Sequence, residues 1–154
     1  MHALETLERL VRKGVYTGPL NLTWIGIGGG FDGPNPFNFF NFIHRAPNGC
    51  TLTAESLLKN VLPFNTMALA MGLHPRCGIE DTIIDQHGNR MTSVQQIEQT
   101  VRIARELGRE IASGKEARDI YRIGMQYKSI DETLAANGMA PNRKQGQKNL
   151  PLAA

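Results

Sequence analysis

The residues best suited to chemistry in this chain are Arg76, Glu80 and Asp81, which lie within the run Arg-Cys-Gly-Ile-Glu-Asp. An apolar segment precedes the run and a polar turn follows at 85–89, so we expect a short strand at about 75–79. The two-residue period of a strand puts Arg76 and Glu80 on one face. Asp81 then follows the strand end, where parallel α/β sheets place their functional groups. A cation and two carboxylates are costly to bury, so the cluster predicts either a functional site or an internal ion pair that closes the strand.

A glycine-rich run and a polar strand end give weaker candidates for ligand binding. Gly28 and Gly29 lie between a predicted strand and a predicted helix, which is the setting of an anion-binding loop. The run lacks the spacing of a dinucleotide-binding fingerprint, and a tight turn is the alternative. Thr53 and Glu55 lie at the end of another predicted strand, where polar side chains would line the mouth of a site. We therefore keep these four residues as candidate substrate contacts.

The composition is that of a globular protein, with 41% hydrophobic and 20% charged residues among 154. Arg143, Lys144 and Lys148 account for the net charge of +3, because the other 14 basic residues (17 minus 3) match the 14 acidic ones. That balance argues against nucleic-acid binding by the folded body. No apolar run reaches the roughly 20 residues of a membrane span, and two cysteines outside any metal-type spacing fit a reducing compartment. We therefore expect a cytoplasmic protein that binds neither membranes nor nucleic acid.

Alternating helical and strand patterns predict a parallel sheet in the first half of the chain. Segments rich in β-formers are expected to be strands at 20–26, 50–54 and 75–79, and a segment with helical apolar spacing precedes each of them. This αβαβαβ order requires crossover connections, which join parallel strands.

The second half of the chain is predicted to be helical. Serine capping boxes begin three helices, pairing Ser93 with Gln96, Ser113 with Glu116, and Ser129 with Glu132. The first of these helices has an apolar stripe that we expect to be its buried face, formed by Val94, Ile97, Val101, Ala104 and Leu107. Beyond Pro141 the sequence is polar and broken, which is typical of an irregular tail.

Three strands are too few for a closed α/β domain. A complete barrel of alternating strands and helices takes about 250 residues, and an isolated three-stranded sheet would expose two edges. We therefore expect an α/β fold that is part of a (β/α)8 TIM barrel, with about the last three βα units and C-terminal helices. In this division residues 1–140 are the C-terminal part of the barrel domain, and residues 141–154 are the irregular tail.

The same residues resemble the C-terminal half of the β-keto acid cleavage enzymes, the family of 3-keto-5-aminohexanoate cleavage enzyme. The resemblance covers nearly all of the chain. It includes the Gly-rich turn after Trp24, the Thr-Leu-Thr strand at 51–53 and, above all, the Arg-x-Gly-x-Glu-Asp motif at 76–81. The segment 101–110 and the following Glu-Ala-Arg at 116–118 are similar to the last barrel helix of the family and its continuation.

This resemblance implies a zinc-dependent barrel enzyme that condenses a β-keto acid with acetyl-CoA, giving acetoacetate and a new acyl-CoA. It implies that Glu80 is a zinc ligand, beside two histidines of a His-x-His motif in the first half of the barrel. Proton transfer would fall to Asp81, and Arg76 would orient Asp81 while pairing with a glutamate of that first half. The implied partners are the β-keto acid, acetyl-CoA, and either further copies in a homo-oligomer or a complementary N-terminal barrel half.

The histidines of this chain depart from the family pattern. None of the four belongs to a His-x-His motif: His2, His44, His74 and His87. Zinc would therefore have one protein ligand where a catalytic site needs three, and we expect the glutamate partner of Arg76 to be missing as well. Two functions remain open from the sequence. One is a zinc-dependent acyl-transfer enzyme, present as a half that is inactive alone; the other is a non-catalytic barrel fragment or assembly subunit.

Overall fold

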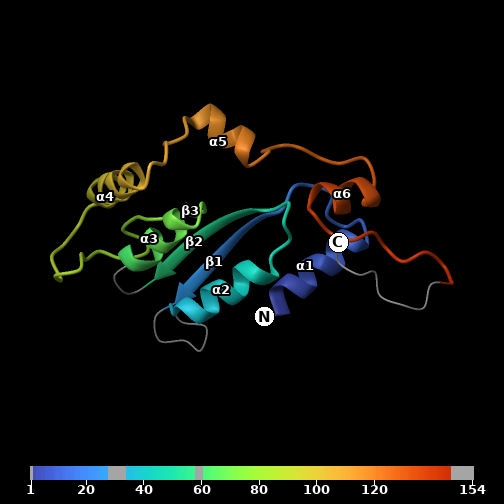
Figure 1. Ribbon diagram of the computed structural model, residues 1–154, viewed down its shortest axis with the longest axis horizontal. Coiled ribbons are helices and arrows are strands. Elements are labelled where there is room, and N and C mark those ends of the chain that lie inside the picture. The colour runs from blue at the N-terminus through green and yellow to red at the C-terminus, as the bar shows by residue number, and fades with distance from the viewer. Residues whose placement is uncertain (1, 28–33, 58–60, 147–154) are drawn as a thin grey trace. The chain divides into compact units, whose positions relative to one another are not determined.

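The computed structural model describes residues 2–27, 34–57 and 61–146, and Figure 1 shows the helices and strands of these ranges. In chain order they are α1 (His2–Arg12), β1 (Asn21–Ile27), α2 (Pro36–Arg45), β2 (Thr51–Leu57), α3 (Leu62–Ala70), β3 (His74–Pro75), α4 (Ser93–Glu106), α5 (Gly114–Ile120) and α6 (Ile130–Ala136). None of the described helices has the length and apolarity that a bilayer crossing requires.

The three strands form one sheet in the order β1-β2-β3. The arrows of β1 and β2 point the same way in Figure 1. β2 pairs with β3 in parallel, with Thr53 opposite His74 and Ala54 opposite Pro75. The predicted α/β arrangement with a parallel sheet is therefore confirmed.

β3 is shorter than the strand predicted at 75–79. Pro75 has no N–H to donate, and the last ladder bond is made by the amide of Arg76, which donates to a β2 carbonyl at 2.8 Å. The chain then turns at 78–81, closed by a backbone hydrogen bond of 3.1 Å between the first and last residues of the turn. The strand prediction was wrong beyond residue 75, so a turn and not strand alternation places the carboxylates that follow.

Aromatic residues from three elements form the core of the sheet region. The indole of Trp24 in β1 lies against Phe39 of α2 and Phe64 of α3, with ring centroids 4.9 and 5.3 Å apart. Offset aromatic pairs of this kind add about 0.5–1.5 kcal/mol to the effect of burial alone. The helices α2 and α3 are therefore held on the face of the sheet that Trp24 occupies.

The two faces of β1 differ. Trp24 and Gly26 are buried, whereas Ile25 and Ile27 are 44% and 48% exposed. A Cβ at position 26 would lie 2.5 Å from the Trp24 indole, so the packing leaves room only for glycine. The other face of β1 presents apolar side chains that the described residues leave largely uncovered.

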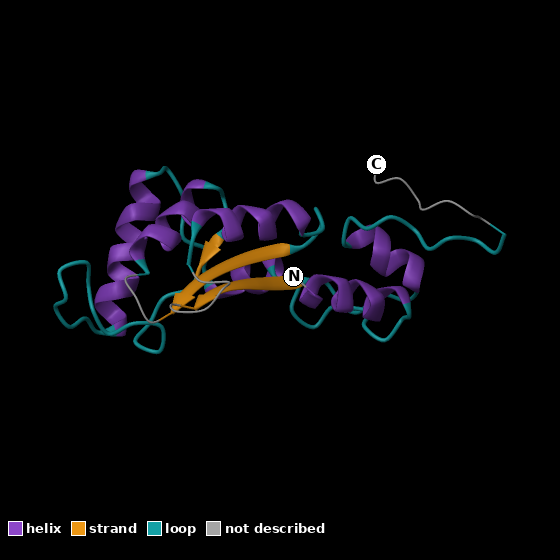
Figure 2. Cartoon of the chain, turned by 90° about the horizontal axis from the view of Figure 1, so that it is seen from below, coloured by secondary structure: helices purple, strands orange, loops and turns teal. Residues whose placement is uncertain are grey.

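The chain divides into two compact units, each built from separated stretches. Unit 1 comprises residues 1–21, 45–51 and 116–154, and unit 2 comprises residues 22–44 and 52–115. In unit 1, α1 packs against α6, and in unit 2, α3 packs against both α4 and β3. Figure 2 shows the strands of the small sheet in orange with helices beside them.

Asn137, directly after α6, is the polar centre of unit 1. Its side chain is completely buried, and its Oδ1 accepts the N–H of Leu20 at 2.7 Å. Its Nδ2 donates to the carbonyls of Gly18 and Thr133 at 3.1 and 2.8 Å. One amide therefore satisfies three backbone groups and links the stretch before β1 to the end of α6.

α4 begins one residue earlier than the predicted capping box allows. The N-cap is Thr92, whose Oγ1 accepts the N–H of Gln95 at 3.2 Å, while the Gln95 side chain accepts the N–H of Thr92 at 2.8 Å. The sequence fits both choices, because Thr-x-x-Gln and Ser-x-x-Gln overlap there. Ser129 is the N-cap of α6 as predicted, because its hydroxyl accepts the Glu132 N–H at 3.1 Å. The Glu132 carboxylate accepts the N–H of Lys128 at 2.9 Å, one residue before the position that a capping box requires.

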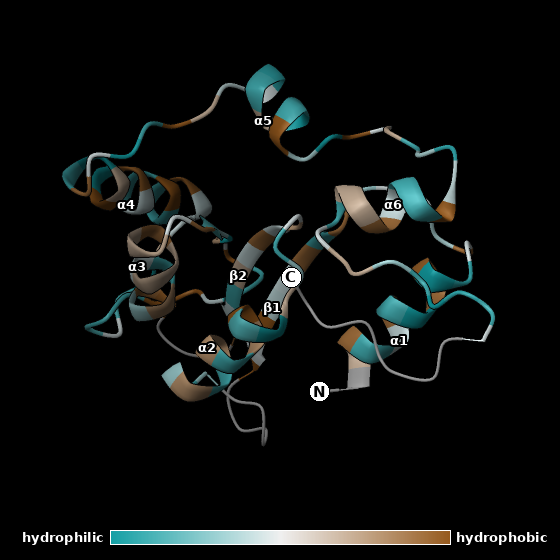
Figure 3. Ribbon diagram, turned by 45° about the vertical axis from the view of Figure 1, so that its right-hand side comes forward, coloured by the Kyte–Doolittle hydropathy of each residue, from teal (hydrophilic) through white to brown (hydrophobic). Residues whose placement is uncertain are grey.

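The buried face of α4 differs from the predicted apolar stripe. Val94, Ile97 and Leu107 are 63%, 49% and 45% exposed, whereas Gln96 and Ala104 are buried. Figure 3 shows hydrophobic and hydrophilic residues side by side along this helix. The stripe prediction was wrong at these three positions, because the buried residues of α4 include a glutamine that binds the Thr82 carbonyl.

Candidate functional site

The turn after β3 brings one arginine into contact with three carboxylates. Nη1 of Arg76 donates to Oε2 of Glu55, on β2, at 2.7 Å. Nη2 donates to Oε2 of Glu80 at 2.5 Å and lies 3.7 Å from Oδ1 of Asp81. The predicted trio is therefore assembled, and a fourth residue from the neighbouring strand joins it. We call these four residues the carboxylate cluster.

The carboxylates of the cluster lie in opposite environments. The side chain of Glu80 is 81% exposed, whereas those of Glu55 and Asp81 are 3% and 1% exposed. Arg76 spans the boundary, with 42% of its side chain exposed. The exposed pair Arg76–Glu80 contributes little to stability, whereas the contact with Glu55 would be costly to break, because it would leave a buried carboxylate without its cation.

Asp81 is the unusual member of the cluster. Both of its carboxylate oxygens are buried, and among the described residues no hydrogen-bond donor reaches either of them. A buried carboxylate normally accepts several hydrogen bonds, because losing its hydration is costly. Apart from the Glu55 carboxyl beside it, no described side chain or backbone group occupies the oxygens of Asp81, which is the arrangement expected of a group that takes a proton from a bound molecule.

The electrostatics of Glu55 follow from its position beside Asp81. Burial raises the pKa of Glu55, and the adjacent Asp81 carboxylate raises it further. The positive charge of Arg76 acts in the opposite direction without reversing the shift. Two buried carboxylates beside one guanidinium thus resist being ionised together.

Glu55 corrects one expectation from the sequence. The resemblance predicted that Arg76 would have no glutamate partner in this chain, and Glu55 is such a partner. Glu55 was expected to contact substrate, and in the structure one of its oxygens is bound to the arginine. The parallel register explains the pairing, because Ala54 lies opposite Pro75 and the next residue of each strand is then Glu55 and Arg76. The proximity of Glu55 and Arg76 can be inferred only once the register between β2 and β3 is known.

The other predicted substrate contacts lie apart from these interactions or outside the described residues. Gly28 and Gly29 fall in a segment that the structure does not describe. Thr53 lies in β2 opposite His74, two positions before Glu55 and therefore on the same side of the strand. Its role in binding remains a prediction.

The described part of the chain does not by itself form the zinc site that the resemblance implies. In residues 2–27, 34–57 and 61–146 no three histidine, cysteine or acidic side chains come together in a way that would hold a metal ion. Glu80, the one proposed ligand, is bound to Arg76. A catalytic zinc site has three protein ligands, so the described residues do not fit the metal on their own.

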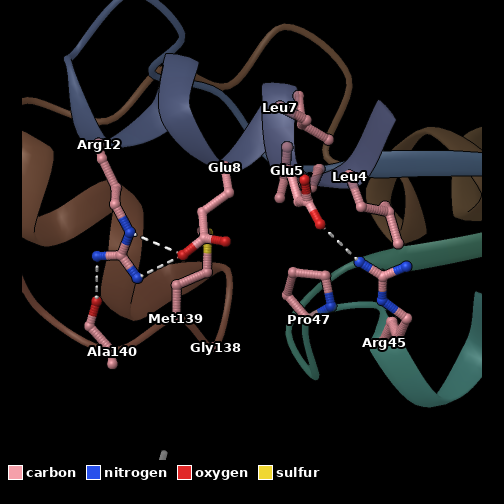
Figure 4. Close-up of a pocket in the computed structure, with 11 residues that line it drawn as sticks. Leu4, Glu5, Leu7, Glu8, Arg12, Arg45, Pro47, Gly138, Met139 and Ala140 are labelled. Carbon is pink, nitrogen blue, oxygen red and sulfur yellow. Dashed lines mark hydrogen bonds and ion pairs between the residues drawn. The ribbon is translucent and has the colours of Figure 1, made fainter. Parts of the chain in front are cut away.

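A cavity of about 440 Å³ lies elsewhere, within unit 1, and Figure 4 shows the residues around it. Its charged groups are already paired: Arg45 binds Glu5 at 3.3 Å and Arg12 binds Glu8 at 2.8 Å. None of the four cluster residues lines it. The carboxylate cluster, and not this cavity, is therefore the candidate site.

Comparison with known proteins gives one family. The sequence model for the beta-keto acid cleavage enzymes matches residues 1–123. The 3-keto-5-aminohexanoate cleavage enzyme of Acetoanaerobium sticklandii is 31% identical over 117 residues, which are 75% of this chain and 42% of that protein. The enzyme of the same name from Fusobacterium nucleatum is 39% identical over 75 residues, 48% of this chain and 28% of that protein.

A third relative carries a different name. The 3-dehydrocarnitine:acetyl-CoA trimethylamine transferase of Rhizobium meliloti is 25% identical over 112 residues, which cover 72% of this chain and 37% of that protein. The chain thus spans less than half the length of each of these three relatives.

Proposed function

The chain belongs to the β-keto acid cleavage enzyme family, and on that premise we propose that it supplies the proton-transfer groups of such an enzyme. The reaction would be acyl transfer between a β-keto acid and acetyl-CoA, giving acetoacetate and an acyl-CoA. The observation that carries this proposal is Asp81, a buried carboxylate without a hydrogen-bond donor among the described residues, 3.7 Å from Arg76. The name of the Rhizobium relative supports acetyl-CoA as the second substrate.

In this proposal the fold is a part of a (β/α)8 barrel. The parallel order β1-β2-β3 and the partial coverage of the relatives support that assignment. The largely uncovered Ile25 and Ile27 of β1 would then face further strands. The remaining strands, and the histidine ligands of the metal, would come from a complementary barrel half.

Each member of the carboxylate cluster has a distinct role. Asp81 acts as the general base or acid, because its oxygens are free to bind a proton. Arg76, whose guanidinium lies 3.7 Å from Oδ1 of Asp81, places a positive charge beside that carboxylate and keeps it oriented. Glu55 fixes the guanidinium through the 2.7 Å hydrogen bond and so determines where the positive charge lies. Glu80 is exposed and is the group available to a metal completed by ligands from another part of the barrel.

The test is turnover in a completed barrel. The chain would be coexpressed with the first half of the Acetoanaerobium relative and assayed for acetoacetate formed from β-keto acids and acetyl-CoA. Asp81→Asn, which keeps the shape and removes the base, should lower turnover by about 10²–10⁴-fold. Glu98→Gln removes an exposed carboxylate of α4 and serves as the matched control. Near-normal turnover by Asp81→Asn would refute the proposed role.

The alternative function is that of a non-catalytic barrel fragment or assembly subunit. A chain that forms a stable complex with the complementary half, yet gives no turnover at any metal concentration, would support this alternative.

A further inference from the structure

The turn that carries Glu80 and Asp81 is held by two side chains of α4. We propose that Gln96 and Ser93 are positioning residues, which fix the direction of Asp81 for proton transfer. This inference rests on the function proposed above for Asp81. It adds residues outside the carboxylate cluster that act on the reaction through the turn.

Two hydrogen bonds attach α4 to the turn, one on each side of Asp81. Nε2 of Gln96 donates to the carbonyl of Thr82 at 2.7 Å. The hydroxyl of Ser93 accepts the N–H of Ile79 at 3.2 Å. The backbone is therefore bound two residues before the candidate base and one residue after it.

The side chains of the turn do not anchor it by apolar burial. Ile79 is 55% exposed, and the side chain of Glu80 is 81% exposed. The nearest cation to Asp81 among the described residues lies 3.7 Å away, beyond hydrogen-bonding distance. Arg76 binds the exposed side chain of Glu80, and Thr100 of α4 contacts Cys77 just before the turn. The bonds from Ser93 and Gln96 are the ones that hold the backbone on either side of Asp81.

The burial of Gln96 supports a specific role for its amide. The residue is 3% exposed, and its Oε1 has no hydrogen-bond partner among the described residues. Placing an amide in such a position is unfavourable unless its groups are bonded, and an apolar side chain of equal size would avoid that cost. The hydrogen bond to the Thr82 carbonyl therefore explains why a glutamine, and not an apolar residue, occupies position 96.

The capping geometry explains why these two residues are available. Because Thr92 and Gln95 form the capping box, Ser93 and Gln96 are not used to cap α4. Both lie in the first turn of the helix and reach the loop that precedes it in the chain. If the N-cap moved by one residue, Ser93 and Gln96 would form the capping box, and their hydrogen bonds to Ile79 and Thr82 would be lost.

The experiment uses the full chain, alone and in the completed barrel. Gln96→Met removes the donor at nearly constant size, and Gln99→Met makes the same change one turn further along α4, at a side chain without hydrogen bonds among the described residues. Gln96→Met should lower kcat by about 10–100-fold and leave KM unchanged, because a misplaced base weakens the transition state more than substrate binding. Ser93→Ala should act in the same direction, and Ser93→Thr, which keeps the hydroxyl, should restore kcat.

Amide hydrogen exchange of the isolated chain gives a second measurement, independent of activity. The Ile79 amide should exchange faster in Ser93→Ala, and the amides of Asp81 and Thr82 should exchange faster in Gln96→Met, with no change in Gln99→Met. Equal kcat in Gln96→Met and Gln99→Met, with Asp81→Asn inactive, would overturn the positioning role and leave the proposed function intact.

If Asp81→Asn is fully active, the proposed function fails, and exchange alone decides whether α4 holds the turn. Unchanged exchange at Ile79, Asp81 and Thr82 in both variants would then refute the anchoring itself. If Gln96→Met does not fold, the comparison of Ser93→Ala with Ser93→Thr replaces it, since Ser93 is only partly buried. Equal kcat in those two serine variants would then overturn the positioning role.

Discussion

Removing the guanidinium of Arg76 should destabilise unit 2 in a way that depends strongly on pH. Arg76→Ala leaves Glu55 and Asp81 buried side by side, 2% and 1% exposed, without their nearest cation. Without the guanidinium, the two carboxyl groups can share a proton, water can enter to hydrate them, or unit 2 can unfold. The variant therefore measures how much of the stability depends on one positive charge.

The magnitude follows from the contacts. Breaking a buried ion pair by removing one partner costs about 3–5 kcal/mol. Arg76 is 42% exposed, so water already screens its charge, and the exposed contact to Glu80 adds little. We therefore expect a loss of about 2–3 kcal/mol near pH 7.5.

The direction of the pH dependence follows from Glu55. Its pKa is raised in the folded chain, so its contribution to stability is complete below the ordinary glutamate pKa and is lost as pH rises through the folded value. Arg76 opposes that shift, so removing Arg76 raises the pKa of Glu55 in the folded chain further. The loss of stability then extends to higher pH. The cost of Arg76→Ala should be small near about pH 4, below the raised pKa of Glu55, and should grow as the pH rises.

Trp24 makes the assay specific for unit 2. It is the one tryptophan of the chain and is buried in the core of that unit, so its fluorescence in a urea titration reports on unfolding there. Arg102→Ala, at an exposed position of α4, is the control and should stay within about 0.5 kcal/mol of the parent at both pH values. An equal loss for Arg76→Ala near pH 4 and near pH 7.5 would show that its charge does not compensate the buried carboxylates.

Three other outcomes are expected. In the completed barrel, Arg76→Lys should lower turnover although it keeps the charge, because an ammonium cannot bind Glu55 and Glu80 with two fixed donors; parental turnover would contradict this. After dialysis, metal analysis of the isolated chain should find no stoichiometric zinc; zinc that is retained and then lost in Glu80→Gln would mean that further ligands exist in this chain. Asn137→Ala should destabilise unit 1 by about 3–5 kcal/mol in urea, because it removes three hydrogen bonds and leaves the buried Leu20 N–H without an acceptor; a loss below about 1 kcal/mol would contradict the role of Asn137.

The sequence predicted the elements whose patterns are local. The β-formers around Trp24 and the apolar spacing of α1 gave the right element types within one or two residues. The strand predicted to end at Ile79 failed because Pro75 and the turn after it end the ladder, which is a matter of backbone hydrogen bonding that hydropathy does not report. The cap of α4 was misplaced because two adjacent residues, Thr92 and Ser93, fit the same motif.

The candidate site was only partly predictable for a different reason. Arg76, Glu80 and Asp81 are close in sequence, so their proximity was evident from spacing. Glu55 joins them through the register between two strands, 21 positions away along the chain, and Gln96 reaches Thr82 from a helix that follows the turn. Non-local pairings of this kind are set by tertiary packing and leave no period in the sequence.

The contact between the two ends of unit 1 has a consequence for synthesis in the cell. Arg12 donates to the carbonyl of Ala140, 128 residues later, and the Asn142 side chain donates back to the carbonyl of Arg12 at 3.0 Å. At the usual 5–20 residues per second, a ribosome needs about 6–26 s to make the chain between these two positions. During that interval the residues of unit 2 are completed while α1 still lacks its partner α6. α1, made before the other described helices, is therefore among the last of them to be packed, and a chaperone that holds α1 would favour assembly over aggregation.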